Sequence, residues 1–340
     1  MRSLGGPIFT VALVGLSVAA VWFFGRQYLD TPLPVGETAQ IVNIRPGASL
    51  IASAEAMAEQ GVLAHPLVFT WYARLRGAGR AIKAGEYRIE PGTKPPALLD
   101  QLVSGRVLLH ALTVVEGWTF DQMLVAIRAH PALEQTLRES DGAEIMAALG
   151  EAGRHPEGLF FPETYRFPRG TSDLELLRQA RALMEERLNA AWAGRNPDLP
   201  FETPYAALTL ASIVEKETAL EDERSLIAGV FVRRLERNMR LQTDPSVIYG
   251  IDGFDGNIRR RDLSIDTPYN TYTRAGLPPT PIALPGAASL DAVMHPAPGD
   301  ALYFVATGER DGSHYFSSTL EEHNEAVRRF LARRRSHESR

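Results

Sequence analysis

The chain has 340 residues, of which 45% are hydrophobic and 23% charged, so its length suits two or three ordinary globular domains. The formal net charge of −5 provides no strongly basic field, and we expect no nucleic-acid partner. Cysteine is absent, which excludes disulfides, cysteine metal sites and thiol catalysis, although it does not fix the cellular compartment.

The amino-terminal stretch has no charged residue between positions 3 and 25. Its centre, 8–24, is apolar and long enough to cross a bilayer as a helix, and the aromatic cluster 22–24 suits a membrane interface. The alternative is a cleaved signal peptide, because small residues at 17–20 resemble a cleavage site. We favour an uncleaved anchor, since the aromatic cluster follows these small residues directly and the apolar run is long.

The expected anchor comprises a short tip and the transmembrane helix, 1–29, followed by a stiff proline-rich linker at 30–37. Arg2 and Arg26 flank the apolar run on both sides, so the charge rule for orientation is weak. The remainder shows no second spanning segment, and we expect it to lie outside the cytoplasm.

A strand-turn-helix pattern recurs three times after the linker. The expected strand and helix of each repeat are 41–44 with 49–60, 87–89 with 96–103, and 112–115 with 120–129. Three repeats do not make a solenoid. We expect a small mixed domain whose strands pair and whose helices cover one face.

Residues 38–110 resemble a LysM-like module, a small fold that grips glycan chains. The resemblance rests on the tracts "IVNIRPGASL" and "IKAGEYRIEPGT". A packing or spacer domain without a ligand is an equal alternative.

A larger, mostly helical domain is expected over 111–335, with an amphipathic helix at 174–192, which makes the chain α+β overall. Its segment 157–165 combines aromatic side chains with two carboxylates, a combination that suits either sugar binding or core packing. From residue 239 the chain is rich in proline and aromatic loops, where sites are often built. The end predicts a hairpin, 301–306 with 314–317, and a last helix.

One helix of this domain carries a carboxylate out of pattern. Thr203 is a suitable cap and is followed by proline, so we expect a helix over 204–218. At 3.6 residues per turn, Ile213 and Val214 share one side with Glu217. Burial on that side would raise the pKa of this carboxyl, as a general acid requires near neutral pH. The alternative is a helix end that reaches solvent or pairs with a base.

Such a base is available in the next expected helix, 225–238. Arg233, Arg234 and Arg237 lie on its polar faces, and one of them could neutralise Glu217 or Glu215. Pairing with Glu217 would lower the pKa of that carboxyl and weaken the general-acid hypothesis.

Four tracts follow one another in the second half of the chain: "ASIVEKET", "RLQTDPSVIYGI", "TPYNTYTRAGLPPTPIALPG" and "LYFVATG…HYFSSTLEEHN". In this order they resemble the YceG-like family of endolytic murein transglycosylases. The resemblance covers nearly the whole chain and is strongest from about 205 to 324. It implies a single-pass protein of the bacterial inner membrane with its catalytic domain in the periplasm. Peptidoglycan glycan strands would be its substrate, and peptidoglycan synthases are candidate partners.

The implied reaction cuts nascent strands internally between N-acetylmuramic acid and N-acetylglucosamine and leaves a 1,6-anhydro end, which would terminate elongation. No water is consumed, so the enzyme would be a lyase without a cofactor. The family's catalytic glutamate matches Glu217, and Glu215 is the second choice. Asp244 is the candidate for the second carboxylate that a hydrolase needs, although an Asp before proline commonly bonds local backbone.

Neutral donors near the reacting sugar would stabilise developing charge. Gln242, Asn270, Tyr269 and Tyr272 are the candidates for substrate contact, with packing of their own loop as the alternative. The histidines show no metal-binding spacing, so no metal is expected. A non-catalytic glycan-binding scaffold of the wall-synthesis machinery remains the alternative function.

Overall fold

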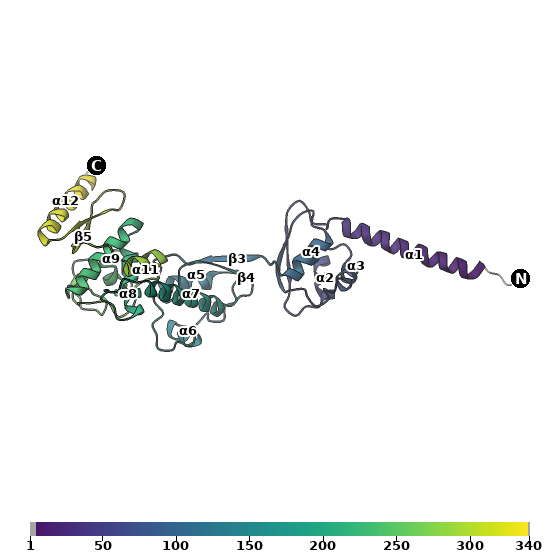
Figure 1. Ribbon diagram of the computed structural model, residues 1–340, viewed down its shortest axis with the longest axis horizontal. Coiled ribbons are helices and arrows are strands. Elements are labelled where there is room, and N and C mark those ends of the chain that lie inside the picture. Colours follow the sequence, from purple (N-terminus) through teal and green to yellow (C-terminus); the bar gives the residue numbers. More distant parts are fainter. Residues whose placement is uncertain (1–4, 339–340) are drawn as a thin grey trace. The chain divides into compact units, whose positions relative to one another are not determined.

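The computed structural model describes the backbone of residues 5–338, with side chains for 15–17 and 19–335. Over these residues the protein is a mixed α+β structure in which helices predominate and the strands form two-stranded sheets (Figure 1). This arrangement confirms the expected α+β class.

The chain divides into two compact units, which are described separately. The first contains residues 1–110 together with 166–170, and the second contains 111–165 together with 171–340. The short return of the chain to the first unit was not predicted from the sequence.

The first unit is built on an antiparallel pair of strands, β1 (Gln40–Ile44) and β2 (Gly85–Ile89), with Val42 opposite Tyr87. Its helices after the linker are α2 (Leu50–Glu59), α3 (Pro66–Leu75) and α4 (Pro95–Ser104). Tyr87 is completely buried, and its hydroxyl donates a hydrogen bond of 2.7 Å to the carbonyl of Lys83. The strand pair and helices therefore share one apolar core.

Local signals set the helix ends in this unit. Ser49 caps α2 by accepting a hydrogen bond from the Ala52 amide, and Gly105 ends α4 in the left-handed conformation at φ 73°. These two predicted helices are confirmed to within about two residues. Helix α3 was missed.

The expected pairing of all three early strands is wrong. Strand β3 (Leu109–Thr113) pairs with β4 (Thr164–Pro168) and not with β1 or β2. Its partner comes from the end of the aromatic turn segment, which shows too short an alternation to indicate a strand.

Helix α1 (Gly5–Asp30) covers the expected membrane segment. Residues 8–14 and 18 of that segment lie outside the residues whose side chains are described. Of the helices in the described part of the chain, none combines the length and the apolar character needed to cross a membrane.

The second unit is organised around α8 (Pro204–Glu217), which packs against four other helices. These are α7 (Asp173–Ala193), α9 (Glu221–Glu236), α10 (Asp244–Tyr249) and α11 (Ala287–Met294). The other helices before α8 are α5 (Phe120–Ala129) and α6 (Gly142–Ala148). A long loop between α10 and α11 contains only the short 3₁₀ helix η1 (Asp262–Ser264). The sequence predicted α5, α7, α8 and α9, treated α10 as irregular and gave no prediction for α11.

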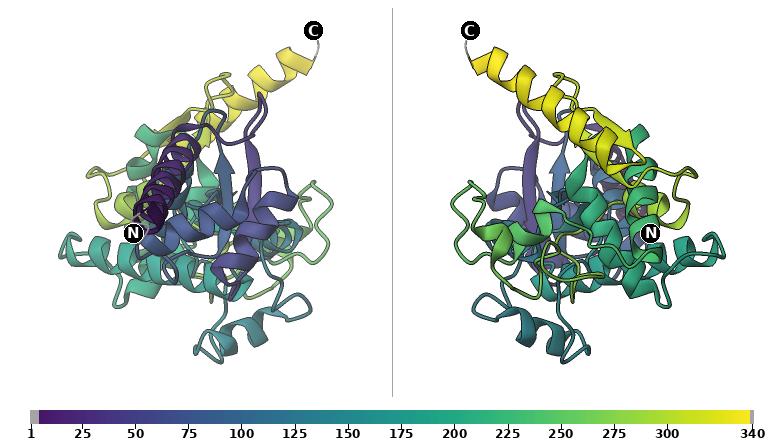
Figure 2. Two further views of the ribbon diagram at one scale, coloured as in Figure 1. Left: turned by 90° about the vertical axis from the view of Figure 1, so that its right-hand side faces the viewer. Right: turned by 90° about the vertical axis from the view of Figure 1, so that its left-hand side faces the viewer.

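The carboxyl-terminal elements confirm the expected hairpin and last helix. Strands β5 (Tyr303–Ala306) and β6 (His314–Ser317) pair antiparallel, with Phe304 opposite Phe316. Helix α12 (Leu320–Glu338) packs beside this hairpin (Figure 2). Strand β5 also contacts α9, which follows α8.

Candidate active site

Helix α8 brings a carboxylate to the end of a buried rod. The Thr203 hydroxyl caps it by accepting a hydrogen bond of 3.2 Å from the Ala206 amide. Every residue from 207 to 214 is buried, so the helix is enclosed on all sides and has no polar face. It ends at Glu217, and Thr218 is already extended at φ −144° and ψ 140°. The Glu217 carboxyl therefore lies at the carboxyl-terminal end of this buried helix.

Glu217 lies partly buried, with one oxygen bonded and one open. Its Oε1 accepts a hydrogen bond from the Thr243 hydroxyl, whereas Oε2 has no hydrogen-bond partner among the described residues. Burial raises the pKa of Glu217 to about 7, and the Asp244 charge adds to the rise, while Thr243 and Arg234 oppose it. The group can thus carry a proton near neutral pH and has a free oxygen to deliver it.

The arginine that could have neutralised Glu217 is engaged elsewhere. Arg234 is buried, and its guanidinium donates to the carbonyls of Leu302 at 2.6 Å and Leu241 at 2.8 Å. It also lies 5.2 Å from the centre of the Tyr303 ring. Arg233 likewise donates to backbone carbonyls. The arginines of α9 therefore bind the hairpin region and act on Glu217 only at longer range.

The start of α10 supplies the groups around Glu217. Gln242 is exposed and holds the left-handed conformation at φ 51°, which is strained for a residue with a side chain. The backbone amide of Gln242 donates a hydrogen bond of 3.1 Å to the Thr271 carbonyl, and the backbone amide of Thr243 donates one of 3.0 Å to the Thr271 hydroxyl. This double attachment fixes the position of the Thr243 hydroxyl against Glu217.

Asp244 and Tyr272 form a pair at the same end of α10. The Tyr272 hydroxyl donates a hydrogen bond of 2.6 Å to Asp244 Oδ1, in place of the local backbone bond expected for Asp244. Burial raises the pKa of Tyr272 above its ordinary range, and the Asp244 and Glu217 charges add to the rise. The structure therefore brings Glu217, Asp244 and Tyr272 together, with Gln242 two residues before Asp244 in the chain.

The other two predicted contact residues hold loops. Asn270 is buried, its amide donates to the carbonyls of Ile265 at 2.7 Å and Asp262 at 3.2 Å, and its oxygen accepts from the Tyr272 amide. Tyr269 shares a hydrogen bond of 2.9 Å with Thr280. In this arrangement Asn270 orients Tyr272, and no polar atom of its side chain remains for a sugar.

Glu215 has a different task from Glu217. Its Oε2 accepts hydrogen bonds from the Gly286 amide at 3.0 Å and the Ser289 hydroxyl at 2.7 Å, so it fastens the start of α11 to α8. Glu116 lies nearby, and burial together with the Glu215 charge raises the pKa of Glu116. The contacts of Glu215 are those of a structural carboxylate.

Glu157 is a further carboxyl with a raised pKa, and it was not singled out from the sequence. Glu157 is 3% exposed, and burial raises its pKa to about 7. It accepts hydrogen bonds from the Phe120 amide at 3.0 Å and the Tyr249 hydroxyl at 3.1 Å. A cavity of about 660 Å³ adjoins it, lined also by Asp121 and Tyr269. The only signal in the sequence was the unusual segment 157–165, which mixes aromatic and acidic residues.

Metal ligation has no arranged site in the part of the chain that the structure describes, where no group of three or more His, Asp or Glu side chains converges.

Comparison with known proteins places these features in a family context. The model of the YceG-like family matches residues 42–329. The endolytic murein transglycosylase of Bacillus subtilis is 30% identical, over 93% of this chain and 92% of that protein. The endolytic murein transglycosylase of Streptococcus pneumoniae is also 30% identical, over 94% of this chain but 64% of that longer protein. A crystal structure of a YceG-like protein from Listeria monocytogenes superposes with a TM-score of 0.56 at 30% identity, covering 85% of this chain and 99% of that one.

Proposed function

The chain belongs to the YceG-like family, and we propose that it is a murein lytic transglycosylase, a lyase that cuts peptidoglycan glycan strands with Glu217 as its proton donor and acceptor. The relatives named endolytic murein transglycosylases support the reaction class. The observation that carries the role of Glu217 is its partly buried carboxyl, with a pKa of about 7 and one oxygen free of partners among the described side chains.

The proposed reaction needs one carboxyl group used twice. Protonated Glu217 donates its proton to the oxygen that links muramic acid to the next sugar, and the bond from the anomeric carbon to that oxygen breaks. The resulting carboxylate takes a proton from the C6 hydroxyl of the same muramic acid, and the C6 oxygen bonds to the anomeric carbon. The proton is recovered, no water enters, and the product ends in a 1,6-anhydro ring.

Nearby side chains would support these steps in distinct ways. Thr243 orients the carboxyl of Glu217 through its hydrogen bond. Tyr272 and Asp244 hold each other beside it, and the exposed side chain of Gln242 is free to reach a sugar hydroxyl. Positioned groups of this kind contribute by orientation and by stabilising developing charge.

The proposed setting is the bacterial inner membrane, with 8–24 as the anchor and the catalytic unit in the periplasm. The uncharged run from 3 to 25 supports this placement. Nascent strands would be cut internally there, close to the peptidoglycan synthases that are candidate partners. The LysM-like segment 38–110 is the proposed second contact with the glycan.

Mass analysis of the cut ends tests the proposal. Purified peptidoglycan is digested with the wild-type chain and with Glu217→Gln, and the muropeptides are weighed. We expect 1,6-anhydro ends from the wild type and at least about 100-fold fewer from Glu217→Gln in the same time, with the folded state of the variant verified by its thermal unfolding.

Two other results would contradict the proposal. Ends that are one water heavier would assign hydrolysis, with Asp244 as the candidate second carboxylate. Binding without any product from the wild type would assign a glycan-binding scaffold.

A further inference from the structure

Helix α3 of the first unit presents an apolar face to solvent. Leu67, Trp71 and Leu75 follow one another at four-residue spacing and are 68%, 65% and 82% exposed. Residues four apart lie on the same side of a helix, so these side chains form one stripe. Phe69 and Ala73 on the opposite side are completely buried in the core. The core therefore fixes the helix with its apolar stripe turned outward, and a contiguous patch of this kind marks an interaction surface.

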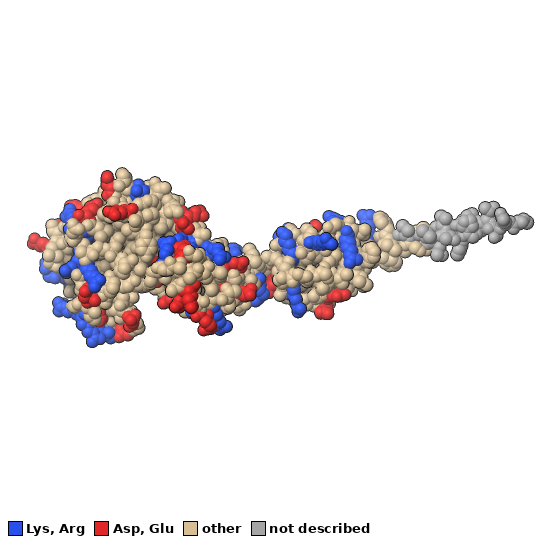
Figure 3. Space-filling view, turned by 90° about the horizontal axis from the view of Figure 1, so that it is seen from below, with Lys and Arg blue, Asp and Glu red and all other residues tan. Residues whose placement is uncertain are grey.

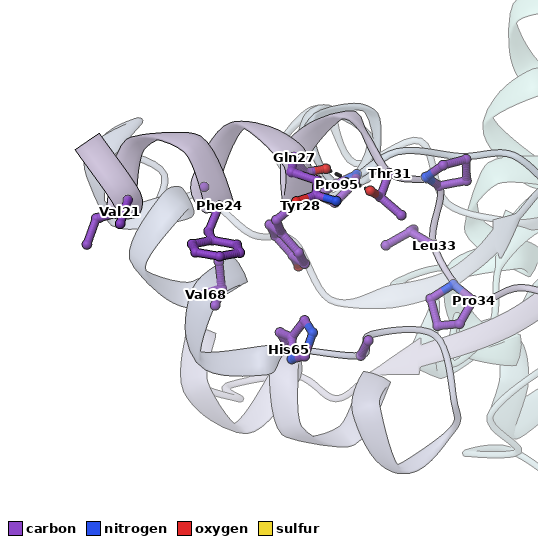
Figure 4. Close-up of a pocket in the computed structure, with 14 residues that line it drawn as sticks. Val21, Phe24, Gln27, Tyr28, Thr31, Leu33, Pro34, His65, Val68 and Pro95 are labelled. Atoms are coloured by element: carbon purple, nitrogen blue, oxygen red, sulfur yellow. Dashed lines mark hydrogen bonds between the residues drawn. The ribbon is translucent and has the colours of Figure 1, made fainter. Parts of the chain in front are cut away.

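The start of α3 adjoins the end of α1. A cavity of about 690 Å³, with a mostly apolar lining, opens between α1, the linker and the start of α3. Figure 4 shows Phe24 of α1 directed toward Val68 of α3, with Tyr28 and His65 also lining the cavity. In Figure 1, α3 lies at the end of the unit from which α1 projects. Val68, at the start of α3, and residues within 20–25 of the uncharged run therefore line one mostly apolar cavity.

Basic side chains accompany the stripe. Arg74 lies within α3, and Arg76 and Arg80 follow its end, all three exposed. Segment 38–110 contains eight Lys and Arg against five Asp and Glu, in a chain whose net charge is −5. Figure 3 shows blue side chains gathered over this unit on the face drawn. An apolar stripe with a Trp and flanking arginines is the pattern of a helix that lies in the interface of an anionic membrane.

We propose that α3 docks on the surface of an anionic lipid bilayer, with Leu67, Trp71 and Leu75 inserted among the lipids and Arg74, Arg76 and Arg80 at the headgroups. The inference rests on the proposed placement of 8–24 in the membrane, which brings the start of α3 close to the bilayer surface. Docking would hold the first unit against the membrane at a fixed height, so the LysM-like segment would meet glycan strands near their site of synthesis.

Single nitroxide labels can locate this face, because the chain has no cysteine of its own. Leu67→Cys, Trp71→Cys and Leu75→Cys are prepared in the full chain, with Glu55→Cys on the exposed side of α2 as the matched control. Each labelled chain is reconstituted in vesicles of phosphatidylcholine with phosphatidylglycerol. Collision with oxygen, which concentrates in lipid, is compared with collision with a water-soluble nickel complex.

We expect the three α3 labels to favour oxygen and the Glu55 label to favour nickel. Exchange of Arg74 and Arg76 for Gln should reduce the ratio of membrane-docked to free α3 about fivefold per arginine. Vesicles of phosphatidylcholine alone, which carry no net negative charge, should also reduce this ratio. Glycan cleavage by the same preparations tests the proposed function separately.

Equal nickel access at all four positions would overturn the proposal. Spin–spin coupling between α3 labels of two chains would also overturn it, because the face would then belong to a second copy. Failure of the chain to float with vesicles would remove its premise while leaving the cleavage reaction untouched.

Discussion

Two carboxyl groups at opposite ends of helix α10 share a raised pKa but differ in what surrounds them. Glu217 meets Thr243 just before α10, and Glu157 meets Tyr249 at its last residue. Burial raises the pKa of each to about 7. Both oxygens of Glu157 are taken by the Phe120 amide and the Tyr249 hydroxyl, whereas one oxygen of Glu217 has no such partner within the described residues.

The comparison shows that a perturbed pKa alone does not identify a catalytic acid. Burial shifts the pKa of any carboxyl group, whether the group is catalytic or only makes structural hydrogen bonds. A general acid must also reach the atom that it protonates. Accessibility therefore separates the proposed acid Glu217 from Glu157, which links α5 to α10.

The largest expected effect is the difference in kcat between the Gln variants of Glu217 and Glu157. Glu217→Gln should lower kcat by about 10²- to 10⁴-fold, because the amide cannot transfer a proton. Glu157→Gln should leave kcat near the wild-type value, since Gln keeps the shape and can still bond Phe120 and Tyr249. Release of anhydro-muropeptides measures both. A loss in Glu157→Gln as large as that in Glu217→Gln would erase the distinction.

Stability against pH should reveal the buried charge of Glu157. Its pKa is about 7 when folded and near 4.5 when unfolded, so the folded state holds the extra proton between these values. Its contribution to stability is complete below about pH 4.5 and is lost as the pH rises through about 7. Glu157→Gln has no carboxyl to ionise and therefore does not lose this stability. Above pH 8 its free energy of unfolding should exceed that of the wild type by up to about 3 kcal/mol.

Urea unfolding of both chains at several pH values measures this difference. Equal free energies of unfolding near pH 4.5 serve as the internal control, since Glu157 is then protonated and resembles Gln. A variant that is less stable than the wild type at high pH would show that the ionised carboxylate is favoured by its hydrogen bonds.

Local signals predicted much of the fold. Capping residues and periodicity located α2, α4, α5, α7, α8 and α9, and the alternation at 301–317 located the hairpin. The pairing of β3 with β4 could not be derived, because both strands are five residues long and pairing depends on distant sequence. Helices α10 and α11 have six and eight residues, too short for a periodic pattern to emerge.

The site was predicted less completely, for a physical reason. The helical wheel favoured Glu217 over Glu215, which it placed on a less apolar flank, but α8 is buried on all sides over 207–214, so an apolar side is not what sets the two acids apart. The difference lies in hydrogen-bond partners that are distant in the sequence. Gly286 and Ser289 both donate to Glu215, whereas Thr243 donates to only one carboxyl oxygen of Glu217. Asn270 was chosen as a polar loop residue, yet its amide closes its own loop.

A smaller effect is expected from replacing Thr243, which should shift the pH dependence of kcat/KM through Glu217 alone. The Thr243 hydroxyl stabilises the charged form of Glu217 and lowers its pKa. Thr243→Val removes this bond, so the fall of kcat/KM on the alkaline side should shift to higher pH. Thr243→Ser keeps the hydroxyl and should keep the wild-type profile, as should Tyr249→Phe at the other end of α10. An alkaline limb that is unmoved in Thr243→Val would disconnect Glu217 from the observed ionisation.

Asp244→Asn should move the same limb in the opposite direction and by the smallest amount. The Asp244 charge raises the pKa of Glu217, and its removal favours the ionised acid, so kcat/KM should begin to fall at a lower pH. The Asn oxygen can still accept from the Tyr272 hydroxyl, which preserves the geometry. Because Asp244 is exposed, water screens its charge and the shift should be modest. Rates of anhydro-product release from pH 5 to 9 measure it. Loss of turnover at every pH would instead make Asp244 a participant in bond cleavage, and the single-carboxyl reaction would give way to a two-carboxylate one.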